Sequence, residues 1–344
     1  MPMPRRAADA AKHLLRSASR HLMTPDPTHD RVLDQALDRS LDWSIDDGRI
    51  AVRSNRSFEP SFSENTAGSL AFQVKPLGPG LSAEDQRQIA NSAVRGLIHE
   101  HFGRDPLLWF DQRSEQARAQ FGSAQGVGAR YALSVERDGL GEIAASYEWG
   151  PRVLEMLPGG VMSLARTALD LVPGLRPFCT VIRCSRGSGG QQVSFELTRD
   201  TRLDDFRPLM DALGMGQRHG GLTTLLAFVL GARFVLPADS STLTLLNTRQ
   251  GPELRLDVNI DALPDAPEQL LPLLRLPMTE RPQKLAALDR WMTAMTPEGY
   301  FGPGQVTVLS VRVRADMPAR LALYLRPVAM AGQPARSDRP LQVA

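Results

Sequence analysis

Apolar and polar residues alternate along the chain in five pairs of short segments, and longer segments with helical periodicity separate the pairs. The segment Tyr131–Glu136 alternates strictly, and the segment 141–149 repeats the pattern after a turn. Alternation with a period of two, interrupted by Gly, Asp or Pro, is typical of antiparallel β-hairpins. The other four pairs lie near 58–75, 178–198, 241–260 and 305–326.

Five hairpins separated by helices predict an α+β fold in which ten antiparallel strands close into a barrel. The fold would consist of five αββ repeats with the helices outside. A barrel this wide has an interior that can hold small molecules rather than only side chains. We expect an N-terminal helical extension over 1–29, a single barrel domain over 30–330 and a disordered tail over 331–344. Helices are predicted near 6–22, 30–46, 83–102, 113–121, 152–170, 202–232, 266–276 and 283–296.

The predicted helix over 30–46 has an acidic stripe beside its apolar one. Leucine or isoleucine recurs every fourth residue from Leu33, and an aspartate follows each of them, ending with Asp46. A magnesium–diphosphate site is one interpretation of so many aspartates. The spacing of four does not give the DDxxD cluster that such sites need, so a solvated helix face is the prediction.

Composition and charge set limits on the partners. The 40 basic and 38 acidic residues give a net charge of +2, and like charges form no block, which does not favour binding to nucleic acid or to a membrane surface. No apolar run reaches the length of a membrane span. Cys179 and Cys184 are five residues apart in a predicted strand, so they should point to opposite faces and stay unpaired. Free thiols suit a reducing compartment, and we expect a cytoplasmic protein.

Several common catalytic sequences are missing. The chain has no GxSxG, HExxH, CxxC or Walker sequence, so neither a hydrolase triad, a metal site nor phosphoryl transfer has a basis in the sequence. The chemistry is therefore expected inside the barrel.

Four segments of the predicted hairpins carry a resemblance to a known family. They are Ser57–Phe62 followed by Leu70–Pro76, Tyr147–Gly150, and Leu321–Pro327. Together with the five repeats, they resemble the soluble aromatic prenyltransferases of the ABBA, or PT-barrel, fold, and most of all the dimethylallyltryptophan synthase branch. The resemblance covers roughly residues 30–328.

In that family a glutamate on an early strand binds the indole N–H and accepts a proton. Glu59, in Phe58-Glu59-Pro60-Ser61, matches this context, and Glu64 is the local alternative. Burial in an apolar chamber would raise the pKa of such a carboxyl group toward that of a useful base.

The family also repeats a Lys/Arg-x-Tyr step, whose cations hold the diphosphate and whose aromatic rings shield the allyl cation. The aromatic positions correspond to Phe72, Tyr147, Phe195 and Tyr324, with Asp257 in the remaining repeat. Of the cationic positions only Arg255 is basic, since the others are Leu70, Ala145, Val193 and Ala322. The resemblance therefore implies that further arginines contribute to diphosphate binding, and Arg183, Arg312 and Arg314 lie on neighbouring strands.

The resemblance implies metal-independent transfer of a prenyl group from an allylic diphosphate to an aromatic, indole-type acceptor in secondary metabolism. No cofactor is expected besides the diphosphate co-substrate, and the chain is expected to be a monomer or a weak homodimer. One alternative is an acid–base enzyme, such as a cyclase or isomerase, on the same barrel. Another is a non-catalytic binding protein. Three or more arginines converging in the chamber would favour the transferase, one would favour the acid–base enzyme, and a chamber without Glu59 would favour the binding protein.

Overall fold

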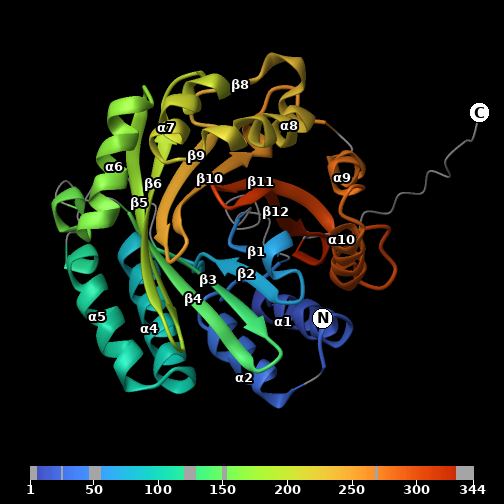
Figure 1. The fold of residues 1–344 in the computed structure, drawn as a ribbon. Coiled ribbons are helices and arrows are strands. Elements are labelled where there is room, and N and C mark those ends of the chain that lie inside the picture. The colour runs from blue at the N-terminus through green and yellow to red at the C-terminus, as the bar shows by residue number, and fades with distance from the viewer. Residues whose placement is uncertain are drawn as a thin grey trace, which may run out of the picture.

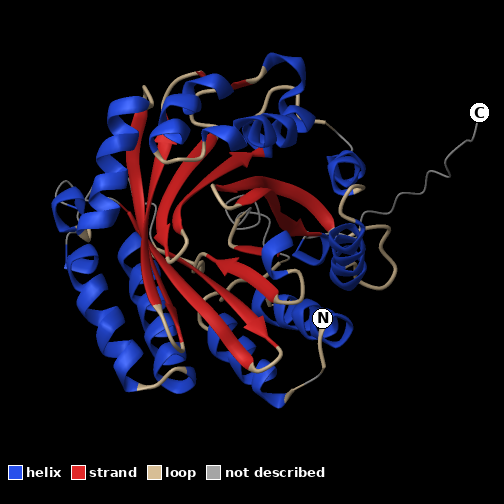
Figure 2. Ribbon diagram, viewed as in Figure 1, coloured by secondary structure: helices blue, strands red, loops and turns tan. Residues whose placement is uncertain are grey.

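Ten antiparallel strands form a closed barrel, as predicted (Figures 1 and 2). The computed structural model describes residues 6–24, 26–45, 56–119, 129–148, 153–267 and 270–330. Around the barrel the strands follow the order β1-β12-β11-β10-β9-β6-β5-β4-β3-β2. They span β1 Phe58–Ser63, β2 Leu70–Val74, β3 Arg130–Glu136, β4 Gly139–Glu148, β5 Leu175–Ser185, β6 Gly189–Leu197, β9 Ser241–Thr248, β10 Gly251–Asn259, β11 Gly304–Arg314 and β12 Met317–Pro327.

The helices lie outside the barrel, also as predicted (Figure 2). They are α1 Ala7–Leu22, α2 Pro27–Leu37, α4 Ala83–His101, α5 Arg104–Ala119, α6 Gly159–Leu171, α7 Arg207–Ala212, α8 His219–Leu230, α9 Leu270–Arg275 and α10 Pro282–Met295. Strands β7 (Thr201–Arg202) and β8 (Val235–Leu236) form a small second sheet that the sequence did not predict. The predicted disordered tail lies outside the described residues.

Helix α2 is shorter than predicted and begins earlier. Asp26 caps it by accepting a hydrogen bond from the backbone N–H of Thr28, and Pro27 occupies the first turn. The helix ends at Leu37 because the chain then turns to pair with the segment after β2: the Leu77 N–H donates to the Ser40 carbonyl, and Leu41 forms a bridge with Leu77.

The two faces of the barrel wall differ in character because only one of them packs on helices. Outward residues are apolar or aromatic and are fully buried. Tyr131 donates to the Ala36 carbonyl of α2, and Tyr147 donates to Asn91 of α4 at 2.7 Å. Alternate positions on the same strands face the lumen and are small, polar or charged.

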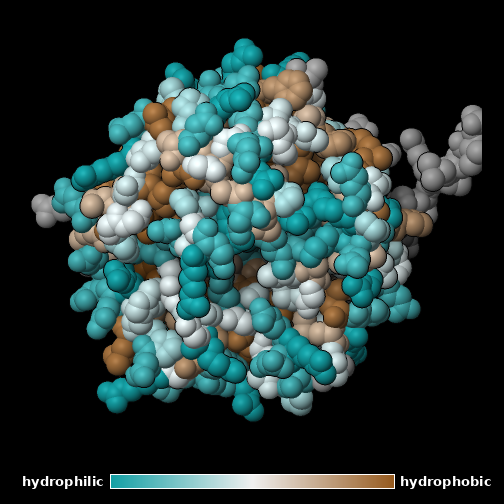
Figure 3. Space-filling view, in the orientation of Figure 1, coloured by the Kyte–Doolittle hydropathy of each residue, from teal (hydrophilic) through white to brown (hydrophobic). Residues whose placement is uncertain are grey.

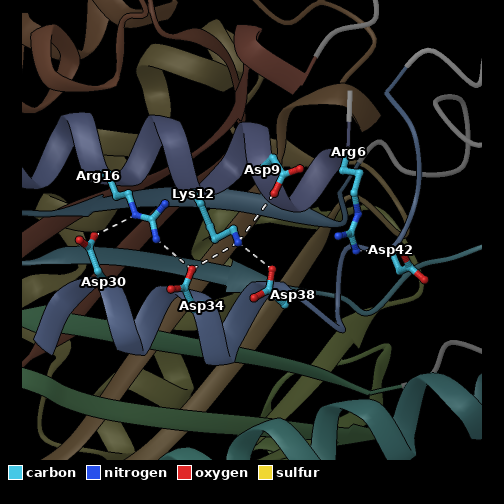
Figure 4. A network of polar contacts seen from close by, with 8 residues as sticks. All are labelled: Arg6, Asp9, Lys12, Arg16, Asp30, Asp34, Asp38 and Asp42. Atoms are coloured by element: carbon cyan, nitrogen blue, oxygen red, sulfur yellow. Dashed lines mark hydrogen bonds and ion pairs between the residues drawn. The ribbon is translucent and has the colours of Figure 1, made fainter. Parts of the chain in front are cut away.

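The aspartates of α2 pair with basic residues of α1 (Figure 4), so their interpretation as a solvated face is incomplete. Lys12 lies 2.7 Å from Asp38 and 3.3 Å from Asp34, and Arg16 lies 2.9 Å from both Asp30 and Asp34. Helix α1 packs against α2 and α10, so the predicted N-terminal extension lies on the barrel domain. Asp46 lies outside the described residues.

We expect Lys12→Met to lower the free energy of unfolding by about 1 kcal/mol at low salt. The methionine keeps most of the half-buried stem but removes the charge shared by three carboxylates, those of Asp9, Asp34 and Asp38. Urea denaturation at low and at high ionic strength checks this, because screening should shrink the difference. Exposed Arg20→Met, on the same helix, should change stability by much less. A loss that salt does not reduce would contradict an ionic origin.

Hydrophilic residues cover most of the molecular face seen in Figure 3, with hydrophobic residues in small scattered areas. Within the described part of the chain, no helix is both long and apolar enough to cross a membrane. Cys179 and Cys184 are free and buried. They point to opposite faces as predicted, since Cys179 lines the lumen and the thiol of Cys184 lies 3.8 Å from the Pro106 carbonyl of α5.

Candidate active site in the barrel lumen

A cavity of about 380 Å³ lies inside the barrel, toward the end opposite the hairpin turns. Its lining is polar: hydroxyl groups of β4, β6 and β9 alternate with charged groups of β3, β4, β6 and β10. The charged residues that line it are Arg56, Arg130, Arg255, Glu148, Glu196, Asp239 and Asp257. A wall this rich in charge suits a ligand that carries charge of its own.

Glu59 lies on the lumen side of β1, but its carboxylate is fully buried. One oxygen, Oε1, accepts hydrogen bonds from Arg56 Nε at 3.1 Å and from Thr307 Oγ1 at 2.6 Å, while Oε2 accepts one from Gln73. Thr307 reaches it from a β-bulge in β11, at the register shift between Val306 and Val308. Glu59 is therefore part of the wall behind Arg56 and Gln73, and its predicted role as the acceptor-binding base stays a prediction.

Positive charges gather on the wall formed by β1, β2 and β3. Burial, together with the like charge of Arg56, lowers the pKa of Arg130, and burial with the nearby Arg130 lowers the pKa of Lys75. Arg56 has Glu59 as its ion-pair partner, whereas Arg130 forms no ion pair with any residue of the described ranges. Glu59 opposes the lowering of the pKa at Arg130, and Glu148 opposes it at Lys75. A group of buried or half-buried cations with this repulsion suits an anionic ligand.

Arg255 faces the lumen from the opposite wall, and its sequence neighbour on that face, Asp257, binds it at 3.1 Å. Burial opposes the charge of Arg255, but Asp257, Tyr324 and Glu253 raise its pKa above the ordinary value. Arg312 is the direct cross-strand partner of Arg255 on β11. Arg255 and Arg312, which the sequence analysis placed on neighbouring strands, are thus directly paired across the two strands.

Arg183 and Arg314 do not join this group. Both side-chain nitrogens Nε and Nη2 of Arg183 bind Glu142, beside a separate hollow of about 540 Å³ at the hairpin end of the barrel. Arg314 forms the same bidentate interaction with Asp316: its Nε and Nη2 each donate a hydrogen bond of 2.8 Å to the carboxylate. Arg183 therefore lies apart from Arg255, and its contribution to diphosphate binding stays a prediction.

Of the four aromatic residues predicted to shield a cation, Phe72, Tyr147 and Phe195 have fully buried side chains, although Tyr147 is also among the residues that line the cavity. The ring of Phe72 packs on Phe58 with centroids 5.8 Å apart, the Tyr147 hydroxyl binds α4, and Phe195 is fully buried opposite Ser194 and Glu196, which line the cavity. Helices cover the outer face of the wall, where the side chains of Phe72 and Phe195 are buried, while their polar neighbours face the lumen. The cation shield stays a prediction.

Besides Tyr147, Tyr324 is among the residues that line the cavity. Burial raises the pKa of its phenol, and Arg255 acts in the opposite direction. On β12 the leucines, rather than the aromatic residue, occupy the outer face. Leu321, Leu323 and Leu325 are buried there, which leaves Tyr324 on the inner face.

Glu64, the alternative to Glu59, is held at the hairpin end of the barrel. Its buried carboxylate lies 2.7 Å from Arg281, the residue before α10, and 3.5 Å from Arg320, and it accepts a hydrogen bond from the backbone N–H of Leu321 at 2.9 Å. These contacts fix the start of β12 against α10, so Glu64 has a structural role and does not reach the cavity.

Sequence reasoning missed Arg56, Arg130, Gln73 and Thr307. A signal existed for Gln73 and Arg130, because both occupy polar positions alternating with the aromatic residues Phe72 and Tyr131. Thr307 had no such signal, since a bulge sets its direction. Among the described residues, no group of three or more His, Cys, Asp or Glu side chains is placed to hold a metal ion.

Solved structures share this fold. The chain matches 6-dimethylallyltryptophan synthase from Micromonospora olivasterospora, in complex with DMASPP and Trp, with a TM-score of 0.72 and 15% identity over 96% of this chain and 99% of that one. It matches PriB in complex with product diphosphate with a TM-score of 0.70 and 16% identity over 97% and 99%. The chain has the fold of these prenyltransferases. The 5-dimethylallyltryptophan synthase from Streptomyces coelicolor gives 0.68 and 16% over 94% and 98%. No protein-family model and no curated protein matches the chain.

Proposed function

We propose that the protein transfers a prenyl group from an allylic diphosphate to an indole-type acceptor. The observation that carries the proposal is the cluster of Arg56, Lys75 and Arg130, of which Arg56 and Arg130 line the cavity and Lys75 lies near Arg130, with Arg255 on the opposite wall. A diphosphate would relieve the repulsion within the cluster through charge-assisted hydrogen bonds. Solved proteins of the same fold bind a diphosphate product or a dimethylallyl thiolodiphosphate together with tryptophan.

In this proposal the cationic wall binds the diphosphate and stabilises the charge that it gains when the allylic C–O bond breaks. The acceptor ring attacks the allyl cation, and a carboxylate takes the proton released on rearomatisation. Glu59 is the predicted base, and Tyr324 supplies an aromatic face for the cation. No metal ion takes part, because the guanidinium groups supply the positive charge.

A second candidate is an enzyme that uses acid–base chemistry on the same barrel. It is favoured by the burial of Phe72 and Phe195 away from the cavity, which leaves Tyr147 and Tyr324 as the members of the predicted shield that line it. Small hydroxyl-bearing residues fill the positions beside them on the lumen face.

Calorimetric titration with dimethylallyl thiolodiphosphate, an unreactive analogue, separates the two candidates. We expect saturable binding in the presence of EDTA, and formation of a prenylated indole and free diphosphate with the reactive compound. If titration shows no binding even at millimolar concentration, the transferase is ruled out and the acid–base enzyme replaces it.

A further inference from the structure

Two hollows lie on opposite faces of the barrel wall and share part of their lining. The inner hollow, of about 540 Å³, is the one beside Arg183, and an outer hollow of about 320 Å³ lies between the wall and helices α5 and α6. Gly189, Gly190, Gln191 and Asn247 line both hollows. The wall is therefore accessible from both faces at these four residues, which we call the hairpin notch.

The notch arises because two neighbouring hairpins, β5–β6 and β9–β10, part before they end (Figure 1). The pairing of β6 with β9 ends at Gln192 and Leu246. Strand β6 nevertheless begins at Gly189, where it still pairs with β5, and β9 continues to Thr248, where it still pairs with β10. Within the described chain, the residues of β6 before Gln192 have no partner on β9. Antiparallel strands turn their N–H and C=O groups to alternate sides, so this stretch presents backbone donors and acceptors to the notch.

Glycines keep the notch free of side chains. A Cβ atom added at Gly190 would have no heavy atom within 4 Å, whereas one added at Gly189 would lie 2.4 Å from the ring of Trp109. Glycine within a strand often marks a place where another backbone approaches closely. The open space at Gly190, next to unpaired backbone groups, therefore suits an extended peptide that pairs with this edge of β6.

The two hollows differ in the side chains that they can accept. Trp109 and Val161 give the outer hollow an apolar lining. Carboxamide and hydroxyl groups line the inner hollow together with Arg249, and the carboxylate of Glu142 at its side is already bound by Arg183. The outer hollow therefore suits an apolar side chain, and the inner hollow suits a polar one.

Positive charge predominates around the notch. Arg113 lines the outer hollow and Arg249 lines the inner one, and both are exposed. Neither of them forms an ion pair with a residue in the part of the chain that the structure describes. Arg186, in the turn between β5 and β6, is exposed as well. Charge complementarity therefore favours an acidic ligand at this end of the barrel.

We propose that the hairpin notch binds an extended segment of a partner protein in which an apolar residue stands between two acidic ones. The segment pairs with the edge of β6 at Gly190, and main-chain hydrogen bonds hold it there. Side chains of a strand alternate between opposite faces. The apolar side chain therefore enters the outer hollow beside Trp109, while its acidic neighbours point to the inner hollow and Arg249. This inference does not depend on the reaction proposed for the lumen.

Fluorescence anisotropy with the labelled, end-blocked peptide Thr-Glu-Val-Glu-Thr tests the notch. We expect saturable binding with a Kd of about 100 μM or lower, in the range of weak, transient contacts. The peptide Thr-Lys-Val-Lys-Thr should bind at least about tenfold more weakly, because its charges repel the arginines. The acidic peptide with an N-methylated backbone should lose affinity to a similar extent, because it cannot donate main-chain hydrogen bonds.

Gly190→Val should weaken binding of the acidic peptide at least about tenfold, because the new side chain fills the notch. The free protein has space for it, and the backbone of Gly190 is not left-handed, so folding is preserved. Arg249→Glu should weaken binding about fivefold and carries the test if the first variant does not fold. Gly68→Val and Arg137→Glu are the matched controls, since they change exposed residues in other turns, and each should leave the affinity within about twofold.

Absence of saturable binding at millimolar peptide, unchanged affinity in Gly190→Val, or equal affinity for the N-methylated peptide overturns the proposal. Arg130→Ala should leave the peptide affinity within about twofold. A loss there equal to that in Gly190→Val would place the peptide in the lumen and refute the notch. Sedimentation velocity is measured in parallel: a wild-type dimer that Gly190→Val dissociates would assign the notch to a second copy of the chain and overturn the partner segment.

Discussion

Glu64→Ala is expected to lower the free energy of unfolding by about 3–5 kcal/mol, the cost of breaking a buried ion pair by removing one partner. The carboxylate is fully buried and lies within ion-pair distance of Arg281 and Arg320. Its removal leaves two half-buried guanidinium groups and the backbone N–H of Leu321 without their acceptor. Urea denaturation followed by circular dichroism gives the difference.

The exposed Glu280→Ala provides the control beside Arg281 and should change stability by no more than about 0.5 kcal/mol. Replacing Glu64 with Gln keeps the volume and one acceptor, so its effect should fall between the two. A loss below about 1 kcal/mol for Glu64→Ala would show that Arg281 and Arg320 find other partners, and that the network does not hold β12 against α10.

The architecture was predictable because two periodicities alternate along the chain. Strand pairs with a period of two, such as Tyr131–Glu136 and its partner, and helices with a period near 3.6 identify elements without any knowledge of contacts. The end of α2 was not predictable in this way. Its leucine and aspartate spacing continues past Leu37, and only the contact between Leu41 and Leu77 shows where the helix stops.

The site was harder to predict because one residue of error in register exchanges the two faces of a strand. Aromatic residues were expected inside the barrel, but this barrel has a polar lumen. Phe72 and Phe195 are buried under helices, and Gln73 and Ser194 face the interior. The family motif aligned aromatic residues in sequence but could not give their direction.

Long-range contacts decided the rest of the site. Glu59 was identified correctly as a buried lumen-side carboxylate, yet its partners come from the preceding turn, from β2 and from a bulge 248 residues away. The contribution of Arg130 to the cationic wall depends on its proximity to Arg56 and Lys75, which are both distant from it in sequence. Neither the contacts of Glu59 nor the grouping of these cations leaves a pattern in the local sequence.

Arg130→Ala is expected to weaken binding of dimethylallyl thiolodiphosphate by about 1.5–3 kcal/mol, roughly 10- to 150-fold in Kd. Arg130 forms no ion pair with a described residue, so its full hydrogen-bonding capacity is available to an anion, in contrast to Arg56, which Glu59 engages. The loss should appear in the affinity for the diphosphate analogue, while binding of 3-ethylindole changes by less than about twofold. Isothermal titration with each compound separately measures both.

Arg183→Ala is the matched control, because Glu142 binds that guanidinium at a different hollow of the same barrel. It removes an identical charge from the lumen and should leave the diphosphate affinity within about twofold. An equal loss in both variants would mean that the effect comes from the overall charge of the barrel. A loss confined to Arg183→Ala would place the anion at the hairpin end and refute the cationic wall of Arg56, Lys75 and Arg130 as the binding site.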